Sequence, residues 1–335
     1  MPMIQPELSV VVPFYNEGGG TDAFLNRLEP VLERLGTTWE VVCVNDGSID
    51  DTFDRLVARH QRKPRIKVLD LSRNFGKEAA LSAGLMYAAG RAVIVIDGDL
   101  QHPPELIPEL VEKWRQGFEM VYAVRRSRRD QDWGTRFAAR TYYEIFHRLS
   151  EVQLPVGAGD FRLFDRKVVA ALNRMPERNR FMKGLYAWIG FRQASVPFDV
   201  EPRGGGKSKW GFLRLIRLGL AGLTSFSNFP LHIWGAIGAI ISGFAILYIV
   251  FRIIRSMVFG IDVPGYESTL ISILFLGGLQ LLTLGIIGDY VGRVFNEVKR
   301  RPLYIVRETH GVPLDVEPTI EGHAEAPRAI GIGGR

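Results

Sequence analysis

Short apolar runs alternate with helical patterns over the first 125 residues of the chain. Runs rich in Val, Ile and Leu predict strands, and apolar side chains three or four positions apart predict helices. The predicted strands are 8–13, 39–45, 66–71, 92–96 and 120–124, and the predicted helices are 22–35, 51–62, 77–89 and 104–116. This alternation predicts an α/β domain built on a mostly parallel sheet with helices on both faces.

The pattern changes after residue 200. Strands 160–164 and 193–200 flank a helix at 166–174, so we assign residues 1–202 to one domain. Residues 203–209 form a basic, glycine-rich loop, and the mixture of apolar and arginine residues that follows predicts a helix lying in a membrane interface. We assign residues 203–228 to this loop and amphipathic helix.

Two long stretches with almost no formal charge follow, at 231–251 and 270–287. Each is long enough to cross a bilayer, which predicts a transmembrane hairpin over 229–292 with spans at about 231–254 and 268–288. Lysine and arginine are more frequent outside the hairpin than in its linker. The positive-inside rule therefore predicts an integral protein of the inner membrane, with the first domain and both termini in the cytoplasm.

The ends of the sequence and its charge complete this outline. The N-terminus lacks a charged region followed by an apolar run, so no signal peptide is expected. Residues 293–314 are predicted to be a cytoplasmic segment and residues 315–335 a disordered tail. The net charge is +6, and two of three basic clusters, at 203–217 and 293–301 but not at 125–140, flank the apolar stretches, which favours lipid headgroups or phosphates over nucleic acid. The single cysteine, Cys43, excludes an intrachain disulfide and is expected to be a small buried side chain.

Two aspartates follow the predicted strand 92–96, in the order Asp97-Gly98-Asp99. Open α/β sheets bind ligands at the carboxyl ends of their strands. Two carboxylates one residue apart suit a divalent cation such as Mg²⁺ or Mn²⁺, and such a cation suits a diphosphate. Taken alone, the same residues would also fit a solvated turn.

Other strand ends add polar and aromatic groups to the same edge. Tyr15 and Glu17 follow the first strand, Asp46 follows the second, and Gln101 lies just beyond the aspartate pair. A flat aromatic ring with acids that accept hydrogen bonds from a base or ribose predicts a nucleotide diphosphate pocket. The sequence has no glycine-rich phosphate-binding motif, so we expect the phosphates to be held by metal and arginines.

Several motifs together resemble family 2 glycosyltransferases of the GT-A fold. The subgroup resembled is that of polyprenyl-phosphate sugar transferases, which includes dolichol-phosphate mannose synthases and, closest, bacterial undecaprenyl-phosphate glucosyltransferases. The motifs lie at residues 11–17, 44–48, 72–77, 97–104, 159–163, 178–184 and 206–209. The resemblance covers roughly residues 7–308 and implies a Rossmann-like GT-A sheet followed by an interfacial helix and two spans.

The resemblance also implies roles for individual residues. The nucleotide sugar would be held by Pro13, Tyr15, Glu17, Asp46, Asp97, Arg125, Arg136, Arg203 and Lys209. A Mg²⁺ or Mn²⁺ ion would be bound by Asp97, Asp99 and Gln101. Asp160 and Asp99 would be the catalytic residues, and the acceptor phosphate would be held by Arg162, Lys207 and Ser208. His102 has no implied role, and we expect an exposed turn histidine.

The implied reaction is an inverting transfer of a hexose from a nucleotide sugar to a polyprenyl (undecaprenyl) phosphate. UDP-glucose is the first choice of donor, because the later motifs look closest to the glucosyltransferases; GDP-mannose, UDP-N-acetylglucosamine and UDP-galactose remain open. The product would be a lipid-linked sugar for cell-envelope glycosylation, such as that of O-antigen, and the resemblance implies a homotetramer. A phosphate monoester loses its second proton near pH 6, so Asp160 is expected to orient the acceptor more than to act as a base.

Two other functions fit part of the sequence. A processive polysaccharide synthase would carry a Gln-x-x-Arg-Trp motif, which the sequence lacks. A nucleotide-sensing membrane scaffold or transport subunit is an alternative from a different class. The complete set of Asp97, Asp99, Gln101 and Asp160 argues for turnover, and therefore for an enzyme.

Overall fold

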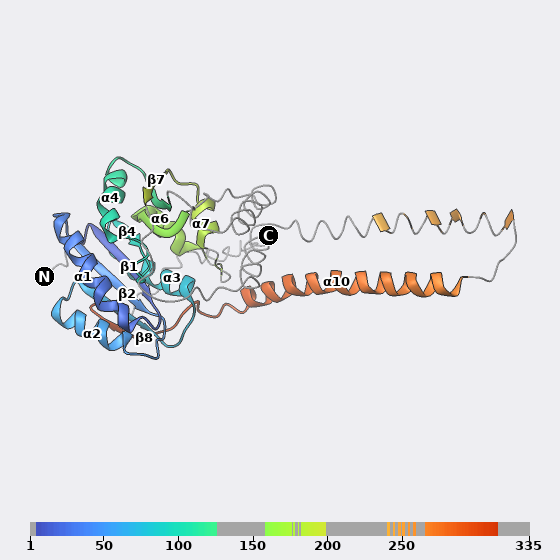
Figure 1. Cartoon of the computed structure of the whole chain (residues 1–335), viewed down its shortest axis with the longest axis horizontal. Helices are drawn as coiled ribbons and strands as arrows, with labels where there is room; N and C mark the ends of the chain where they lie inside the picture. Colours follow the sequence, from blue (N-terminus) through green and yellow to red (C-terminus); the bar gives the residue numbers. More distant parts are fainter. Residues whose placement is uncertain are drawn as a thin grey trace, which may run out of the picture.

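The structure is a computed structural model that describes residues 5–125, 158–175, 177, 180, 182–198 and 265–313, together with scattered positions between 240 and 258. Within these residues one sheet is formed by eight strands (Figure 1). The strands are β1 (Leu8–Phe14), β2 (Trp39–Asn45), β3 (Ile66–Leu71), β4 (Ala92–Val95), β5 (Met120–Arg125), β6 (Ala158–Asp165), β7 (Gln193–Phe198) and β8 (Val306–His310).

The helices lie between these strands along the chain. They are α1 (Gly18–Arg34), α2 (Thr52–Arg62), α3 (Lys77–Tyr87), the 3₁₀ turn η1 (Pro104–Leu106), α4 (Ile107–Arg115), α6 (Arg166–Arg174), α7 (Met182–Trp188) and α10 (Tyr266–Val298). The predicted strands and helices of the first 125 residues are all present, with boundaries within four residues of those predicted. The predicted helix 104–116 is divided into η1 and α4.

The strand order is β7-β5-β6-β4-β1-β2-β3-β8. Parallel pairing joins β4, β1, β2 and β3, and also joins β5 to β7. β6 lies antiparallel between β4 and β5, and β8 lies antiparallel beside β3. The predicted α/β sheet is therefore confirmed, with a parallel centre and antiparallel strands toward both edges.

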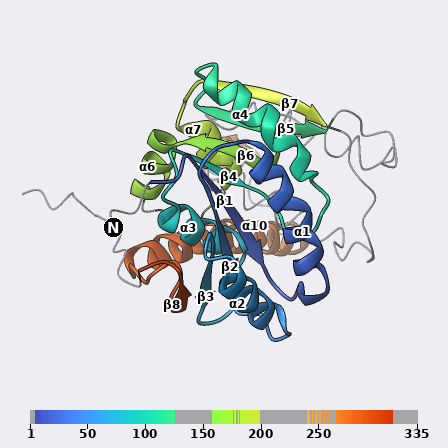
Figure 2. The same ribbon diagram turned by 90° about the vertical axis from the view of Figure 1, so that its left-hand side faces the viewer.

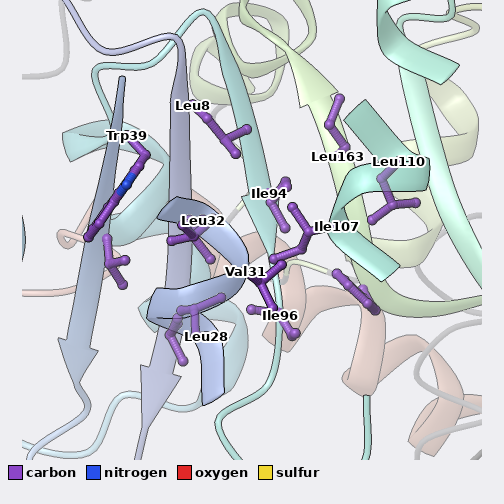
Figure 3. Close-up of a cluster of buried hydrophobic side chains, with 14 of the residues drawn as sticks. Leu8, Leu28, Val31, Leu32, Trp39, Ile94, Ile96, Ile107, Leu110 and Leu163 are labelled. Carbon is purple, nitrogen blue, oxygen red and sulfur yellow. The ribbon is translucent and has the colours of Figure 1, made fainter. Parts of the chain in front are cut away.

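Apolar side chains alternate between the two faces of the sheet and form two cores. On one face, α1, α2 and α4 cover residues such as Val10, Val12 and Ile94 (Figures 2 and 3). On the other face, α3, α6 and α7 cover residues such as Val11 and Val95. Burial on both faces explains why the central strands are continuous apolar runs. Cys43 is a fully buried free cysteine in the first of these cores, as expected.

α10 differs from the other helices because it extends away from the sheet (Figure 1). Its segment Phe275–Val298 is long and apolar enough to cross a membrane, with a mean hydropathy of 1.3. Of its 18 most apolar consecutive residues, 0% are buried. This helix contains the predicted second span, 268–288, and continues to Val298. The predicted interfacial helix at 203–228, most of the first predicted span at 231–254 and the tail at 315–335 lie outside the described residues.

Two elements were not predicted from the sequence, α7 and β8. β8 follows α10 and returns the chain to the sheet, where it pairs with β3. The amide of Ser72 donates to the carbonyl of Ile305 over 2.9 Å, and the Arg307 guanidinium donates to the carbonyl of Ser72 over 2.6 Å. The segment after α10 is therefore an edge strand of the sheet, and it covers β3.

Candidate active site

The candidate site lies at the carboxyl ends of the parallel strands β1, β2 and β4, where the antiparallel strand β6 begins. We call this end of the strands the sheet edge of the site. β1, β2 and β4 run in the same direction, so the loops after Phe14, Asn45 and Val95 lie at this edge. In the antiparallel register of β4 and β6, Val95 is opposite Arg162. Continuing that register by two residues places Asp160 opposite Asp97.

The turn after β4 is tight and depends on Gly98. A Cβ atom at this position would lie 2.6 Å from the Phe14 ring, closer than side chains pack. Leu100 has a left-handed backbone with φ of 60°. Asp99 accepts two hydrogen bonds from Gln101, one from its amide at 3.1 Å and one from its side-chain Nε2 at 2.6 Å. The turn thus presents Asp97, Asp99 and Gln101 together.

The donor set of this turn fits a divalent cation that is shared with a substrate. Among the described residues, no group of three or more His, Cys, Asp or Glu could hold a metal ion. Asp97, Asp99 and Gln101 instead offer two carboxylates and one amide oxygen. Mg²⁺ is commonly bound through one or two carboxylates plus substrate phosphates, so the turn fits a cation whose remaining ligands come from a diphosphate.

Lys77, the first residue of α3, lies between two of the acidic side chains. Its Nζ is 2.7 Å from Asp97 Oδ1, 2.8 Å from Asp97 Oδ2 and 2.7 Å from Asp160 Oδ2. Burial alone would lower the pKa of Lys77, but the negative charges of both aspartates and their hydrogen bonds raise it above its ordinary value. Lys77 therefore stays protonated at neutral pH and links the turn after β4 to β6.

Asp160 is held in its ionised form by the positive charges around it. Burial alone would raise the pKa of Asp160, but Lys77 and Lys183 lower it to about 2. Arg162 adds a smaller contribution in the same direction. A carboxylate with such a low pKa is a weak base at neutral pH.

Arg162 is buried beneath this site. It is only 1% exposed, and its guanidinium lies 4.7 Å from the ring centre of Tyr186 and 5.2 Å from that of Tyr122. Its Nε donates to the carbonyl of Gly159 over 3.0 Å. These contacts favour a role in positioning Asp160 and keeping it ionised. Direct contact of Arg162 with an acceptor phosphate stays a prediction.

Asp46, at the end of β2, positions the loop that leads to Lys77. It is 3% exposed, and its two carboxylate oxygens accept hydrogen bonds from the amides of Phe75 at 2.7 Å and Gly76 at 2.9 Å. Burial raises the pKa of Asp46, and these hydrogen bonds offset the increase only in part. Both oxygens thus serve the protein backbone, and contact with a nucleoside stays a prediction.

The loop after β1 carries the other predicted nucleoside contacts. Pro13 lies within β1, and Tyr15 is 47% exposed at the edge of the sheet. Asn16, with φ of 54°, receives a hydrogen bond from the Ile49 amide at 2.9 Å and donates from its own amide to Ser48 at 3.0 Å. These bonds tie the first loop to the second. The Glu17 amide donates to Thr52 over 3.0 Å, which leads the chain into α1.

Glu78 and Lys183 are two charged residues near Asp160 to which we gave no role from the sequence. Glu78 Oε2 is buried and has no hydrogen-bond partner among the described residues. Burial, followed by the charge of Asp160, raises the pKa of Glu78 to about 7. Lys77 and Glu78 begin α3, directly after the loop 72–76 that follows the parallel strand β3. Loops at this end of parallel strands carry site residues, and this position was the signal that could have identified both side chains.

The remaining predicted residues fall into two groups. Arg125 is the last residue of β5, where it is in register with Phe198. Arg136, Arg203, Lys207, Ser208 and Lys209 lie outside the described residues. The expectation that His102 is exposed was wrong, because His102 is 6% exposed. Its ring lies 5.7 Å from Phe161 and 5.4 Å from Phe198, so it packs beside the site as an aromatic side chain.

Comparisons with known proteins identify the family of the chain. The family model "Glycosyl transferase family 2" matches residues 9–172. An uncharacterized glycosyltransferase of Synechocystis is 52% identical over 306 residues, which cover 91% of this chain and 96% of the relative. A prophage-derived bactoprenol glucosyl transferase of Shigella flexneri is 42% identical over 304 residues, which cover 91% of this chain and 98% of the relative.

One solved structure aligns with part of the chain. Mannosyl-3-phosphoglycerate synthase of Rubrobacter xylanophilus has a TM-score of 0.47 and 18% sequence identity, over 64% of this chain and 71% of that chain. The identity to the full-length relatives and the matching family model together lead to one assignment. This chain belongs to glycosyl transferase family 2 and is a glycosyltransferase with a GT-A-like fold.

Proposed function

We propose that the protein transfers glucose from UDP-glucose to a polyprenyl phosphate at the cytoplasmic face of a membrane. The observation that carries this proposal is the similarity to bactoprenol glucosyl transferases, because it extends over 91% of the chain and so includes both the carboxylate edge and α10. In the reaction, a phosphate oxygen of the acceptor bonds to the anomeric carbon of glucose. The bond from that carbon to the diphosphate breaks, and UDP leaves. The configuration at the anomeric carbon is inverted, as the family resemblance implies.

The carboxylate turn would bind the donor. Asp97, Asp99 and Gln101 would hold a divalent cation, which supplies positive charge to the leaving diphosphate when it is bound. Tyr15 and Glu17 stand on the neighbouring loop, at a position suited to the nucleoside. Preorganised charges of this kind act on the charge that develops in the transition state, which is where an enzyme gains most of its rate enhancement.

Asp160 would orient the reactants without removing a proton. An efficient general base has a pKa near the working pH, whereas the pKa of Asp160 is about 2. The acceptor phosphate loses its second proton near pH 6, so the attacking oxygen needs no base in the cytoplasm. An ionised Asp160 would instead keep Lys77 in place and exclude other orientations of the acceptor.

The path of the chain supports a membrane hairpin. α10 has the length and composition of a membrane span, and β8, which follows it, pairs with β3 of the catalytic sheet. If α10 crosses the bilayer, the chain before α10 must cross it as well, because both β7 and β8 belong to the same sheet. This requirement supports the two spans that the hydropathy pattern predicts.

The test is a transfer assay with the full chain in lipid nanodiscs. Undecaprenyl phosphate and Mg²⁺ or Mn²⁺ are supplied with UDP-glucose, UDP-galactose, UDP-N-acetylglucosamine or GDP-mannose, and the lipid product is identified by mass spectrometry. We expect a hexosyl undecaprenyl phosphate from UDP-glucose at a kcat/KM at least about tenfold above that of the other donors. The Asp99→Asn variant is the matched control.

The assay can also contradict the proposal. Preferred use of another donor would leave the polyprenyl-phosphate transferase activity and reject UDP-glucose. Nucleotide binding with no lipid-linked sugar from any donor would favour the sensing or scaffold alternative.

A further inference from the structure

Lys77 occupies the side of Asp97 at which a cation would bind. Its Nζ is within 2.8 Å of both Asp97 oxygens, at 2.7 and 2.8 Å. An ammonium group and a divalent cation repel each other strongly at such distances. This repulsion disfavours both positive charges on one carboxylate, so we expect a cation that binds Asp97 to displace Lys77 from at least one of its oxygens.

The surroundings of Lys77 allow this displacement. The Lys77 side chain is 41% exposed, and a lysine side chain has several rotatable bonds. Its second partner, Asp160 Oδ2 at 2.7 Å, lies on another strand and is separate from the proposed cation ligands. Lys77 can therefore release Asp97 while it keeps its ion pair with Asp160.

The backbone of Lys77, in contrast, is fixed. Asp46 accepts hydrogen bonds from the amides of Phe75 and Gly76, immediately before Lys77. Gly76 has φ of 97°, a left-handed conformation that glycine adopts without strain. The side chain of Lys77 can thus move while its point of attachment stays at the edge of the sheet.

From this geometry we infer that Lys77 is a positioning residue that binds Asp97 in alternation with the divalent cation. Without a cation, Lys77 neutralises Asp97 and keeps the turn in place. When the cation arrives with the donor diphosphate, Lys77 remains on Asp160 and holds its carboxylate beside the reacting groups. This inference rests on the proposed cation site and does not depend on which sugar is transferred.

The alternation predicts that free cations bind weakly as long as Lys77 is present. The test is titration of the full chain in detergent with Mn²⁺ alone, with free Mn²⁺ measured by electron paramagnetic resonance. We expect Lys77→Met to bind Mn²⁺ about tenfold more tightly than the unmodified protein, because a competing positive charge is gone. Lys77→Arg keeps the charge and should restore weak binding.

A second lysine provides the matched control. Lys167 forms an ion pair with Glu119 at the opposite end of β6, so Lys167→Met also removes an ion-paired lysine, but away from the site. Its Mn²⁺ affinity should equal that of the unmodified protein. A gain of affinity that is specific to Lys77→Met cannot come from general loss of structure, because damage to the fold would weaken binding.

The inference is overturned if Lys77→Met binds Mn²⁺ with unchanged or lower affinity, or if Lys77→Arg binds as tightly as Lys77→Met. The titration contains neither donor nor acceptor, so it is decided independently of the transfer assay. A protein that shows the Mn²⁺ effect but makes no lipid-linked glucose would retain the role of Lys77 and lose the proposed function.

Discussion

The sheet domain and α10 are both rich in apolar residues, but they place them in opposite surroundings. Ile94 in β4 is 0% exposed and lies between the sheet and its helices (Figure 3). Leu284 in α10 is 64% exposed. In the sheet domain, apolar side chains exclude water by packing on one another, whereas many apolar side chains of α10 are exposed. Apolar content alone therefore does not distinguish a packed core from an exposed apolar surface.

The comparison is tested most directly by two matched substitutions to alanine, one in the sheet core and one on α10. Ile94→Ala should lower the free energy of unfolding by about 2–5 kcal/mol, because it leaves a cavity in a packed core. Leu284→Ala should change it by no more than about 0.5 kcal/mol, as is usual for exposed positions. Thermal or denaturant unfolding of both variants in the same detergent gives the two values. Similar losses for the two variants would mean that α10 is packed against protein.

A charge on α10 tests which phase surrounds it. Leu284→Arg should disfavour membrane insertion by about 2.5–3.5 kcal/mol, the cost of arginine near the centre of a transmembrane helix. The measurement is the fraction of protein recovered in carbonate-washed membranes. Ile305→Arg is the control, since Ile305 is 53% exposed but lies beyond α10. Full recovery of Leu284→Arg would place α10 in water or against another protein surface.

The chemistry, unlike the membrane contact, should depend directly on the carboxylates at the sheet edge. Asp99→Asn should lower kcat/KM for transfer about 100-fold, since it removes the charge of a proposed cation ligand, and should leave membrane recovery unchanged. The transfer assay and the membrane wash are run on the same preparation. A variant with normal transfer would remove Asp99 from the site, and a variant lost from the membrane would show that the two regions are not independent.

The smallest expected effect concerns Glu78, whose burial in the sheet domain changes its protonation. Its pKa is raised from 4.5 to about 7, so between these values the folded protein binds a proton that the unfolded chain has released. The free energy of unfolding should therefore fall by about 2.5 kcal/mol as the pH rises from 5 to 8. Glu78→Gln removes this contribution.

The measurement compares unfolding midpoints of Glu78→Gln and the unmodified protein at pH 5 and pH 8. The variant should gain stability relative to the unmodified protein at pH 8 but not at pH 5. Glu109→Gln, an exposed residue of α4, is the control and should show no such difference. An equal effect of Glu78→Gln at both pH values would mean that Glu78 is ionised throughout this range.

Local patterns were enough to predict most elements of the sheet domain. The runs of β-branched residues that form β2 and β3 and the helical spacing of α6 gave boundaries that agree with the structure. α1 begins four residues earlier than predicted, because Asp50 accepts a hydrogen bond from Gly18 and so supports a start that the glycine run would not favour. β8 was missed because its sequence, VRETH, is mostly polar and forms a strand only through pairing with β3.

Part of the site could not be predicted, because it is formed by contacts between residues that are far apart in the sequence. The aspartate turn was visible because Asp97, Asp99 and Gln101 lie within five residues of one another in the sequence. Lys77 joins two residues that are 20 and 83 positions away along the chain. Its role follows from the antiparallel insertion of β6, and strand direction cannot be deduced from hydropathy. The same insertion buries His102 between two aromatic rings.

β8 has a mechanical consequence for the site. Ser72 donates its amide to the carbonyl of Ile305, immediately before β8, at 2.9 Å, and its carbonyl accepts from the Arg307 guanidinium in β8 at 2.6 Å. Ser72 begins the short loop that Asp46 holds at Phe75 and Gly76. The segment that follows α10 is thus connected to Lys77 through this path of hydrogen bonds and the backbone of residues 72–76. A change in the tilt of α10 should therefore be passed through this path to the loop that carries Lys77, beside the carboxylates of the site.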